Sequence, residues 1–217
     1  MQNNSVKIYF SEIKIAKIAN CFFDVTLDDL LHFQKIKNHK RKLQFLFGRS
    51  LLRRALKLYG IKQESVINLR GKPSIALLAK GIRFNLSHSH NLVALVVSFD
   101  CRVGIDIQKI KKINRPKKLL NKITNNSFND QKPDPQNHYL IKQWVMKESV
   151  VKAMGEGIHF GLKNIDVNDN SSQALANRAH DSSPKKAWYL HHFRPCFEYY
   201  GCVATEMPNL DVTYCYL

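Results

Sequence analysis

The sequence predicts an α/β protein made of two similar halves. In the first half, a long amphipathic helix ends at Gly60 and is followed by a strand, a loop and the apolar strand 92–99. A second helix, which ends at Gly155, leads through the same order of elements to strands within 187–205. Hydrophobic residues make up 44% of the 217 residues and charged residues 24%, which is typical of a packed core. We therefore expect two α/β subdomains that share a cleft, at 1–101 and 102–217.

The periodicity of apolar residues places the elements of the first half. Residues 6–10 alternate as in a strand, and residues 27–39 have helical spacing with two acids in the first turn. Residues 40–59, KRKLQFLFGRSLLRRALKLY, form the longest predicted helix because their apolar residues follow one stripe. The other expected elements of this half are a strand at 66–69, a turn at 70–73, and a polar stretch at 84–89 leading into the buried strand 92–99.

The second half starts with a strand at 103–108 and a basic, partly helical segment at 109–122. Residues 124–138 are polar and contain two prolines, which is typical of an exposed loop. The stretch Trp144–Gly157 follows as a helix that Gly155 and Gly157 end. The other expected elements are a strand ending at Val167, a Ser- and Asn-rich surface segment at 168–184, and a hairpin of two strands at 187–193 and 197–205.

The composition limits the partners and the location of the protein. Thirty-four Lys and Arg against seventeen Asp and Glu give a formal charge of +17, which favours anionic partners without choosing among them. The five cysteines are odd in number and form no CxxC pair, so free thiols in a reducing compartment are expected. The sequence shows neither a signal peptide nor an apolar run of about 20 residues, so we expect a cytoplasmic protein without a membrane partner.

The helix WVMKESVVKAMGEG carries an unusual group of charges. Glu148 and Lys152 are four residues apart and therefore share a helix face, and Lys147 adjoins the acid. Taken alone, this pattern is more typical of an exposed ion pair on a helix, worth about 0.2–0.5 kcal/mol. Two other stretches change that interpretation.

The strand VGIDIQ places an acid within an apolar run. Period two puts Gly104, Asp106 and Gln108 on one face, and a buried carboxylate is costly unless a cation or a donor meets it. Gly104 leaves room for a ligand to approach the backbone. In the preceding stretch FNLSHS, Ser87 and His88 are as consistent with polar residues at a strand edge as with an anion site.

The three stretches have complementary chemistry. Asp106 and Glu148 offer hard oxygen ligands of the kind that magnesium prefers, with phosphates completing the shell. Lys147, Lys152 and His88 can meet phosphate charge. Phosphate transfer needs little more than positioning and neutralisation of charge.

In these motifs the sequence resembles the 4′-phosphopantetheinyl transferases of the Sfp type, the Gsp/Sfp/HetI/AcpT superfamily. Phe-Asn-x-Ser-His, Gly-x-Asp and Trp-x-x-Lys-Glu-Ser-x-x-Lys-x-x-Gly occur in the family's order, and Gly71-Lys72-Pro73 also matches. The resemblance spans about 40–167. It implies two α/β subdomains related by a pseudo-two-fold axis, with coenzyme A in the cleft between them. The implied reaction is Mg²⁺-dependent transfer of 4′-phosphopantetheine to a serine of an apo carrier protein in fatty acid, polyketide or nonribosomal peptide biosynthesis.

The resemblance also implies roles for individual residues. Asp106 and Glu148 would hold Mg²⁺ with the pyrophosphate of coenzyme A, and Glu148 would be the base for the carrier serine. Lys152 would neutralise the leaving phosphate. The coenzyme A contacts would come from Ser87, His88, Lys147 and Lys152, with Lys72 and Arg49 at the 3′-phosphate end.

One position departs from the family pattern. The third acidic position is Gln108, which can ligate Mg²⁺ through its carbonyl oxygen but brings no charge. The hypothesis is therefore a metal site of Asp106, Glu148 and Gln108 with weakened affinity for Mg²⁺. The polar loop 124–138 also differs from the helical segment of many relatives, which leaves the carrier protein undefined.

Two alternatives stay open at this level. The charge and the basic helix 40–57 would suit a nucleic-acid-binding protein, although no DNA- or RNA-binding signature appears and the two acids stay unexplained. The other alternative is a catalytically weakened homologue that binds coenzyme A without turnover. The favoured expectation is a monomeric enzyme with an acidic carrier protein as partner and no nucleic acid.

Overall fold

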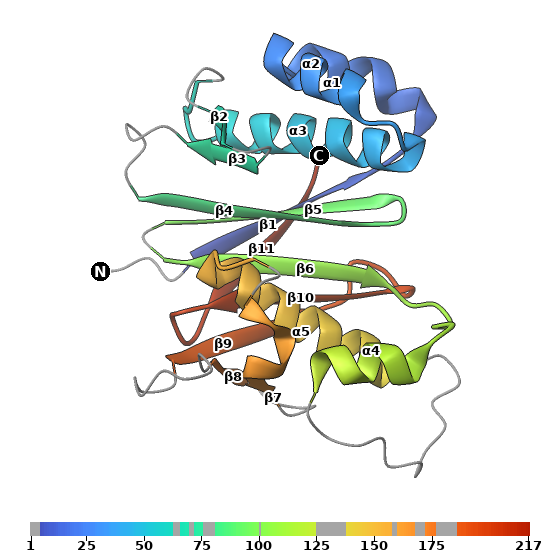
Figure 1. The fold of residues 1–217 in the computed structure, drawn as a ribbon. Coiled ribbons are helices and arrows are strands. Elements are labelled where there is room, and N and C mark those ends of the chain that lie inside the picture. The colour runs from blue at the N-terminus through green and yellow to red at the C-terminus, as the bar shows by residue number, and fades with distance from the viewer. Residues whose placement is uncertain are drawn as a thin grey trace.

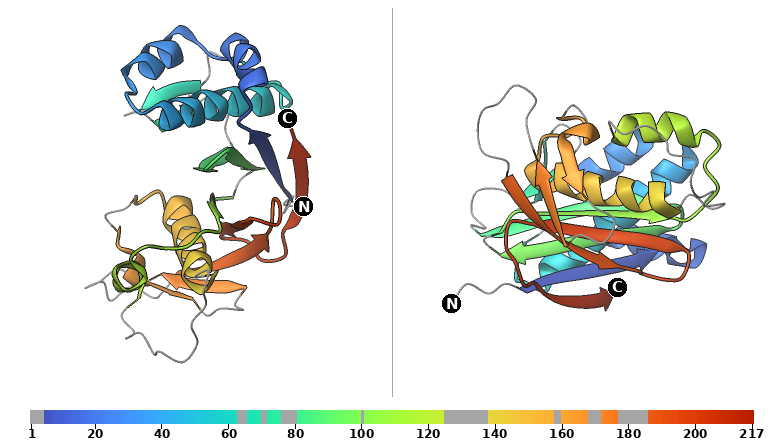
Figure 2. Two further views of the ribbon diagram at one scale, coloured as in Figure 1. Left: turned by 90° about the vertical axis from the view of Figure 1, so that its right-hand side faces the viewer. Right: turned by 90° about the horizontal axis from the view of Figure 1, so that it is seen from below.

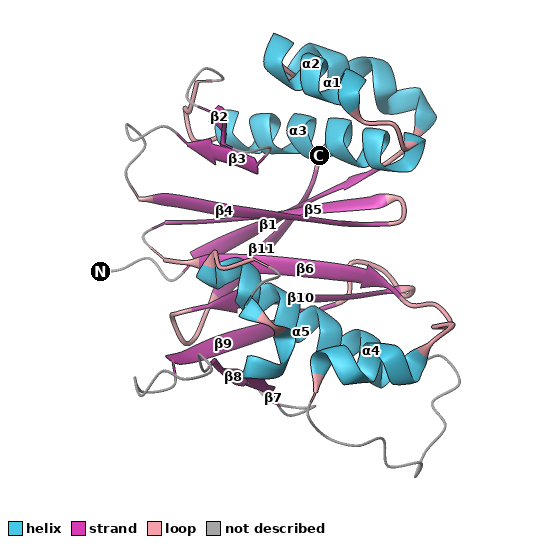
Figure 3. Cartoon of the chain, in the orientation of Figure 1, coloured by secondary structure: helices cyan, strands magenta, loops and turns pink. Residues whose placement is uncertain are grey.

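The computed structural model places two packed β-sheets between two groups of helices (Figures 1 and 3). Two further strands, β2 (Val66–Leu69) and β3 (Lys72–Ile75), pair as a hairpin of which only the backbone is described. The described residues are 5–62, 66–69, 72–75, 81–99, 101–124, 138–157, 160–167, 172–176 and 186–217.

The first sheet has four strands in the order β11-β1-β5-β4, in which β1 and β11 run parallel and the other pairs antiparallel. Leu51, Leu52 and Ala55 of helix α3 pack on Leu95 and Val97 because the helix presents an apolar stripe to the sheet. The strands are β11 (Asp211–Tyr216), β1 (Ser5–Glu12), β5 (Leu92–Phe99) and β4 (Ile82–Ser89), and the helices are η1 (Ile15–Lys17), α1 (Ile18–Asp24), α2 (Leu27–Lys35) and α3 (His39–Lys57).

The second sheet has five strands in the order β6-β10-β9-β8-β7, and α5 packs across it. Val145, Met146 and Val150 of α5 share a buried cluster with Trp188 and Cys202 of the sheet. The strands are β6 (Val103–Lys109), β10 (Tyr199–Thr205), β9 (Lys186–Phe193), β8 (Gln173–Ala176) and β7 (Ile165–Val167), and the helices are α4 (Pro116–Ile123), α5 (His138–Met154) and η4 (Leu162–Asn164).

An inner core joins the two sheets. One face of β1, with Ile8 and Phe10, meets the face of β6 that carries Ile105 and Ile107, because alternate residues of a strand point to opposite sides. Phe193 of β9 completes the contact, with its ring 5.8 Å from that of Phe10. The order of layers is helices, sheet, sheet, helices, and Figure 2 shows both groups of helices on the outside.

The predicted fold class is confirmed, with differences in detail. The helix expected at 27–39 ends at Lys35, because a second helix begins at His39 with Asn38 as its cap. Sequence reasoning missed α1 and β11. The subdomain boundary after residue 101 stays a prediction: the chain does pass from one sheet to the other between β5 and β6, but β11 returns to the first sheet. Within the described residues, no helix is long and apolar enough to cross a bilayer.

Candidate active site

The candidate site begins where α5 contacts β6 at Gly104. A Cβ at this position would lie 2.2 Å from the carbonyl oxygen of Ser149 and 2.3 Å from the backbone nitrogen of Ala153. The space that the sequence suggested for a ligand is therefore filled by the backbone of the helix. The close approach has a functional consequence, because Glu148 and Lys152 flank these contacts on α5 and are brought over Asp106.

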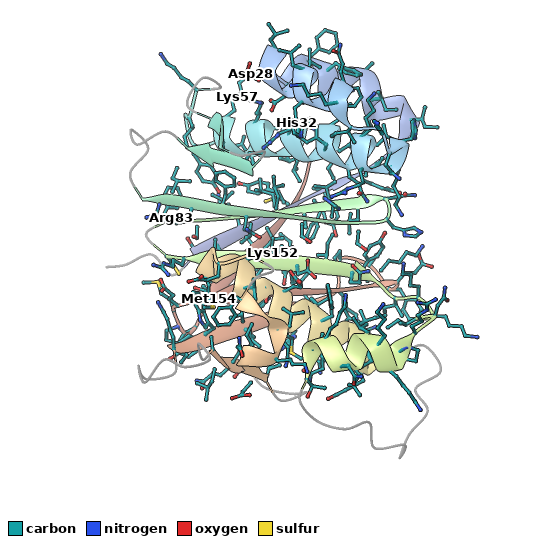
Figure 4. All side chains as sticks on the ribbon, in the orientation of Figure 1. Asp28, His32, Lys57, Arg83, Lys152 and Met154 are labelled. Atoms are coloured by element: carbon teal, nitrogen blue, oxygen red, sulfur yellow. The ribbon has the colours of Figure 1, made fainter. Side chains whose placement is uncertain are left out.

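Asp106 is buried and paired on one side only. Its Oδ1 accepts hydrogen bonds from Ser87 Oγ at 2.8 Å and from Lys152 Nζ at 2.6 Å. The ammonium of Lys152 also donates to the carbonyl of Ile105 at 3.0 Å, which fixes its position. Oδ2 is buried and has no hydrogen-bond partner among the described residues. Figure 4 shows Lys152 at the level where the two halves meet.

Glu148 faces the same cluster. Burial raises the pKa of its carboxyl group, the negative charge of Asp106 raises this pKa further, and Lys152 lowers it. The charges of Glu148 and Asp106 therefore act on one another, although the two residues lie 42 positions apart in the chain. Their convergence on one metal ion stays a prediction.

Three polar side chains of β4 connect the two halves at this site. Asn85 Oδ1 accepts from the backbone N–H of Ile105 at 3.1 Å, and Ser87 Oγ accepts from that of Ile107 at 3.2 Å. Ser89 Oγ continues the series by accepting from Lys109 N–H at 3.0 Å. These contacts take the place of backbone hydrogen bonds between β4 and β6. Ser87 lies buried in this junction and donates to Asp106, and its expected contact with a phosphate stays a prediction.

His88 points away from that junction. It lines a cavity of about 600 Å³ bounded by the α2–α3 connection and α3. The side chain reaches solvent, but the surrounding protein desolvates the imidazole and lowers its pKa, and the charges of Lys152 and Arg41 lower this pKa further. The other residues of this cavity are His32, Ile36, Lys37, Asn38, Arg41 and Phe45.

Two other predicted phosphate contacts, Lys147 and Arg49, lie elsewhere. Lys147 is 5% exposed, and its ammonium donates to the carbonyl of Ile123 at 2.5 Å, so the structure does not bring it to Asp106. Consecutive helix residues are about 100° apart, which explains why Lys147 and Glu148 face different surroundings. Arg49 is buried beside Asp29, with Nε 3.2 Å from Oδ1, and its guanidinium lies over the Phe45 ring. For Lys72 only the backbone is described, so its assignment stays a prediction.

The donor set fits a divalent cation. Within the described part of the chain, no group of three or more His, Cys, Asp or Glu side chains gathers as a metal site. The charge of Asp106 does act on Glu148, and Asp106 presents a buried oxygen that no donor among the described residues satisfies. A cation bound near both carboxylates would relieve their repulsion, and Mg²⁺ commonly uses one or two protein carboxylates while phosphates complete its shell. The residues are therefore compatible with Mg²⁺ but do not enclose it alone.

A second cavity, of about 320 Å³, is lined in part by Gln108. Its apolar lining comes from Ile113, Leu119, Ile141 and Trp144. Lys109, Lys111 and Lys112 also line it, so it combines apolar side chains with positive charge.

The profile of the "4'-phosphopantetheinyl transferase superfamily" matches residues 102–214, which include β6 and α5. The chain belongs to this superfamily. The match contains Asp106, Glu148 and Lys152, while Ser87 and His88 precede it. The matched range therefore covers β6 and α5, and the β4 side chains lie outside it.

Several curated members of the superfamily resemble the chain. The 4′-phosphopantetheinyl transferase gsp of Aneurinibacillus migulanus is 26% identical over 83% of this chain and 77% of its own length. HetI of a Nostoc strain is 30% identical over 60% of each chain. The transferase psf-1 of Bacillus pumilus is 32% identical over 55% of this chain and 53% of its own. The chain thus spans between about half and three quarters of the length of these relatives.

Sequence reasoning did not single out four candidate site residues, which are Ser89, Arg41, His32 and Lys37. Ser89 follows Ser87 at the same spacing at which Gln108 follows Asp106, a two-residue period that could have indicated it. Arg41 carried no comparable signal because its neighbours Lys40 and Lys42 are also basic, and no pattern in the sequence set His32 or Lys37 apart.

Proposed function

We propose that the protein transfers the 4′-phosphopantetheine group of coenzyme A to a serine hydroxyl of an apo carrier protein and releases adenosine 3′,5′-bisphosphate. The observation that carries this proposal is the convergence of Asp106, Glu148 and Lys152 from β6 and α5. The superfamily match and the names of the relatives support the same reaction.

The site has a basic cavity that suits one end of coenzyme A. The cavity around His32, Lys37, Arg41 and His88 is basic, and we assign it to the adenosine and phosphate end. Phe45 offers a ring in this cavity. Arg49 is buried with its guanidinium over that ring, so its proposed role at the 3′-phosphate is to add positive charge rather than to touch the ligand. Lys72 keeps its proposed place near this end through the resemblance alone.

We assign Mg²⁺ to the carboxylates of Asp106 and Glu148. Bound there with the pyrophosphate, Mg²⁺ would neutralise the charge that develops on the phosphate oxygens. Asp106 would offer Oδ2, because Lys152 and Ser87 already hold Oδ1.

The residues of the chain then perform the transfer. The carrier serine oxygen bonds to the phosphorus of the phosphopantetheine phosphate, and the bond from this phosphorus to the bridging pyrophosphate oxygen breaks. The electron pair leaves with adenosine 3′,5′-bisphosphate. Glu148 accepts the serine proton, for which its raised pKa makes it a stronger base than an exposed carboxylate. Lys152, oriented by Ile105 and Asp106, stabilises the charge on the departing phosphate.

The partner in this proposal is an acidic carrier protein. Residues 109–122 contain seven Lys and Arg and no acid, and they border the smaller cavity and α4. A surface of this charge would guide an acidic domain toward the site. We also propose that the enzyme is monomeric and cytoplasmic and that it has no nucleic-acid or membrane partner.

Mass spectrometry of an apo carrier domain tests the function. Incubation with the protein, coenzyme A and Mg²⁺ should increase the carrier mass by one phosphopantetheine group. Asp106→Asn should abolish the gain, and the exposed Asp211→Asn should not. Binding of coenzyme A without a mass gain would favour a weakened homologue, and absence of both would contradict the proposal.

A further inference from the structure

Two serines of β4 repeat one arrangement on β6. Ser87 accepts a hydrogen bond from the backbone of Ile107 and donates to the side-chain oxygen of Asp106 at 2.8 Å. Ser89 accepts from the backbone of Lys109 and donates to Oε1 of Gln108 at 3.2 Å. Each serine thus accepts a hydrogen bond from one backbone N–H of β6 and orients the side chain of the β6 residue just before that N–H.

This arrangement determines how the amide of Gln108 is turned. Ser89 is 7% exposed, and its hydroxyl proton has Gln108 Oε1 as acceptor. Turning the amide over would remove that acceptor and leave a buried donor unsatisfied, which is costly. With Oε1 directed to β4, the planar amide directs Nε2 to the other side. None of the described residues accepts a hydrogen bond from Nε2.

We propose that Gln108 donates a hydrogen bond from Nε2 to a pyrophosphate oxygen of coenzyme A instead of ligating the metal ion, and that Ser89 is the positioning residue for this donor. The inference rests on the proposed function, since it assigns a role toward the same substrate. It replaces the sequence hypothesis in which the carbonyl oxygen of Gln108 completes the metal shell.

The chemistry of the two roles differs in a measurable way. A metal ligand contributes to coenzyme A binding only when Mg²⁺ is present. An amide donor contacts the anionic substrate directly, and hydrogen bonds to charged acceptors are among the stronger ones. The presence or absence of Mg²⁺ therefore separates the two assignments without any measurement of turnover.

Calorimetry of coenzyme A binding tests the assignment in EDTA and in saturating Mg²⁺. Gln108→Leu should weaken binding about tenfold in both conditions. Ser98→Ala is the control for the loss of a buried serine hydroxyl, because Ser98 is also buried but donates to Cys101 and lies at the other end of the β4–β5 pair from Ser89. Its affinity should equal that of the wild type in both buffers.

A double-variant cycle tests the positioning role of Ser89. Ser89→Ala should weaken coenzyme A binding about threefold, because the amide of Gln108 is then free to turn over. In the Gln108→Leu background the same substitution should have no further effect on affinity. Equal losses from Ser89→Ala in both backgrounds would show that Ser89 acts only on the general structure of the junction.

Two outcomes overturn the inference, and they are distinguishable. If Gln108→Leu reduces affinity only in Mg²⁺, then Gln108 is a metal ligand and the proposed function stands. If the wild type binds no coenzyme A in either buffer, then the proposed function fails together with this assignment.

Discussion

At the scale of single residues, the two carboxylates of the candidate site have different environments. Asp106 receives an ammonium and a hydroxyl on one oxygen, while Glu148 is desolvated and faces the charge of Asp106. Sequence reasoning could identify both acids, because an acid within an apolar strand and an acid four residues before a lysine are visible patterns. It could not predict that Lys147 turns away, since that depends on where the carbonyl of Ile123 lies.

Removing the charge of Glu148 should stabilise the protein at neutral and alkaline pH. The pKa of Glu148 is raised in the folded state, so its contribution to stability is present at low pH and is lost as pH rises through the folded-state value. Glu148→Gln should therefore melt at a higher temperature than the wild type at pH 8, with a smaller difference at pH 4. The exposed Glu12→Gln provides the control and should change little. A lower melting temperature of Glu148→Gln at pH 8 would contradict a raised pKa for this carboxyl group.

Replacing Lys152 should change both the rate and its pH dependence. Lys152→Met removes the positive charge beside the leaving phosphate, which should reduce kcat by about 10²–10³-fold. Because Lys152 also lowers the pKa of Glu148, its loss should raise that pKa and move the acid limb of the pH–rate profile to higher pH. A reduced rate with an unmoved acid limb would show that Glu148 is not the base.

At the scale of elements, the contact between α5 and β6 brings the chemistry together. Periodicity predicted both elements and the face of β6 that carries Asp106. It did not reveal that the backbone of α5 fills the space at Gly104, because a glycine leaves room equally for a ligand and for a neighbouring backbone. The junction of β4 with β6 was also not predictable, since it uses side-chain hydrogen bonds rather than a regular ladder.

Gly104→Ala should displace α5 and inactivate the protein. The added methyl group would overlap backbone atoms of Ser149 and Ala153, which cannot move without the whole helix. We expect urea denaturation to show that the free energy of unfolding falls by about 1–3 kcal/mol. We also expect carrier modification to be lost.

Gly48→Ala is the matched control for that substitution. The nearest atom to a Cβ at Gly48 is Val93 Cγ1 at 3.9 Å, and the residue lies within helix α3. Alanine should therefore be neutral or stabilise the helix by about 0.5–1 kcal/mol. Equal effects of the two substitutions would contradict the packing described at Gly104.

At the scale of the whole molecule, two sheets pack face to face and the site lies where their edge strands β4 and β6 meet. The two-part α/β organisation was predictable from the repeated order of elements. The return of β11 to the first sheet was not, because Asp211–Tyr216 belongs to the predicted second half, 102–217, and yet pairs with β1 at the opposite end of the chain. The formal charge of +17 also belongs to the whole molecule, and it favours anionic partners.

Charge reversal near the smaller cavity should slow modification of an acidic carrier. Lys117→Glu with Lys118→Glu should reduce kcat/KM for the carrier about five- to tenfold at low salt, and the difference should shrink at about 0.5 M NaCl. A control on the other half is Lys57→Glu with Arg54→Glu, at the exposed end of α3. Figure 4 shows Lys57 well separated from Lys152. Equal effects of the two double variants would locate the carrier elsewhere.

The most direct test of the account is a crystal structure with coenzyme A in which Mn²⁺ replaces Mg²⁺, because the anomalous scattering of manganese locates the ion independently of the surrounding atoms. We predict one anomalous peak within bonding distance of Oδ2 of Asp106, a carboxylate oxygen of Glu148 and the pyrophosphate. Coenzyme A bound with no peak between these two carboxylates, or with the ion held by other residues, would contradict the account.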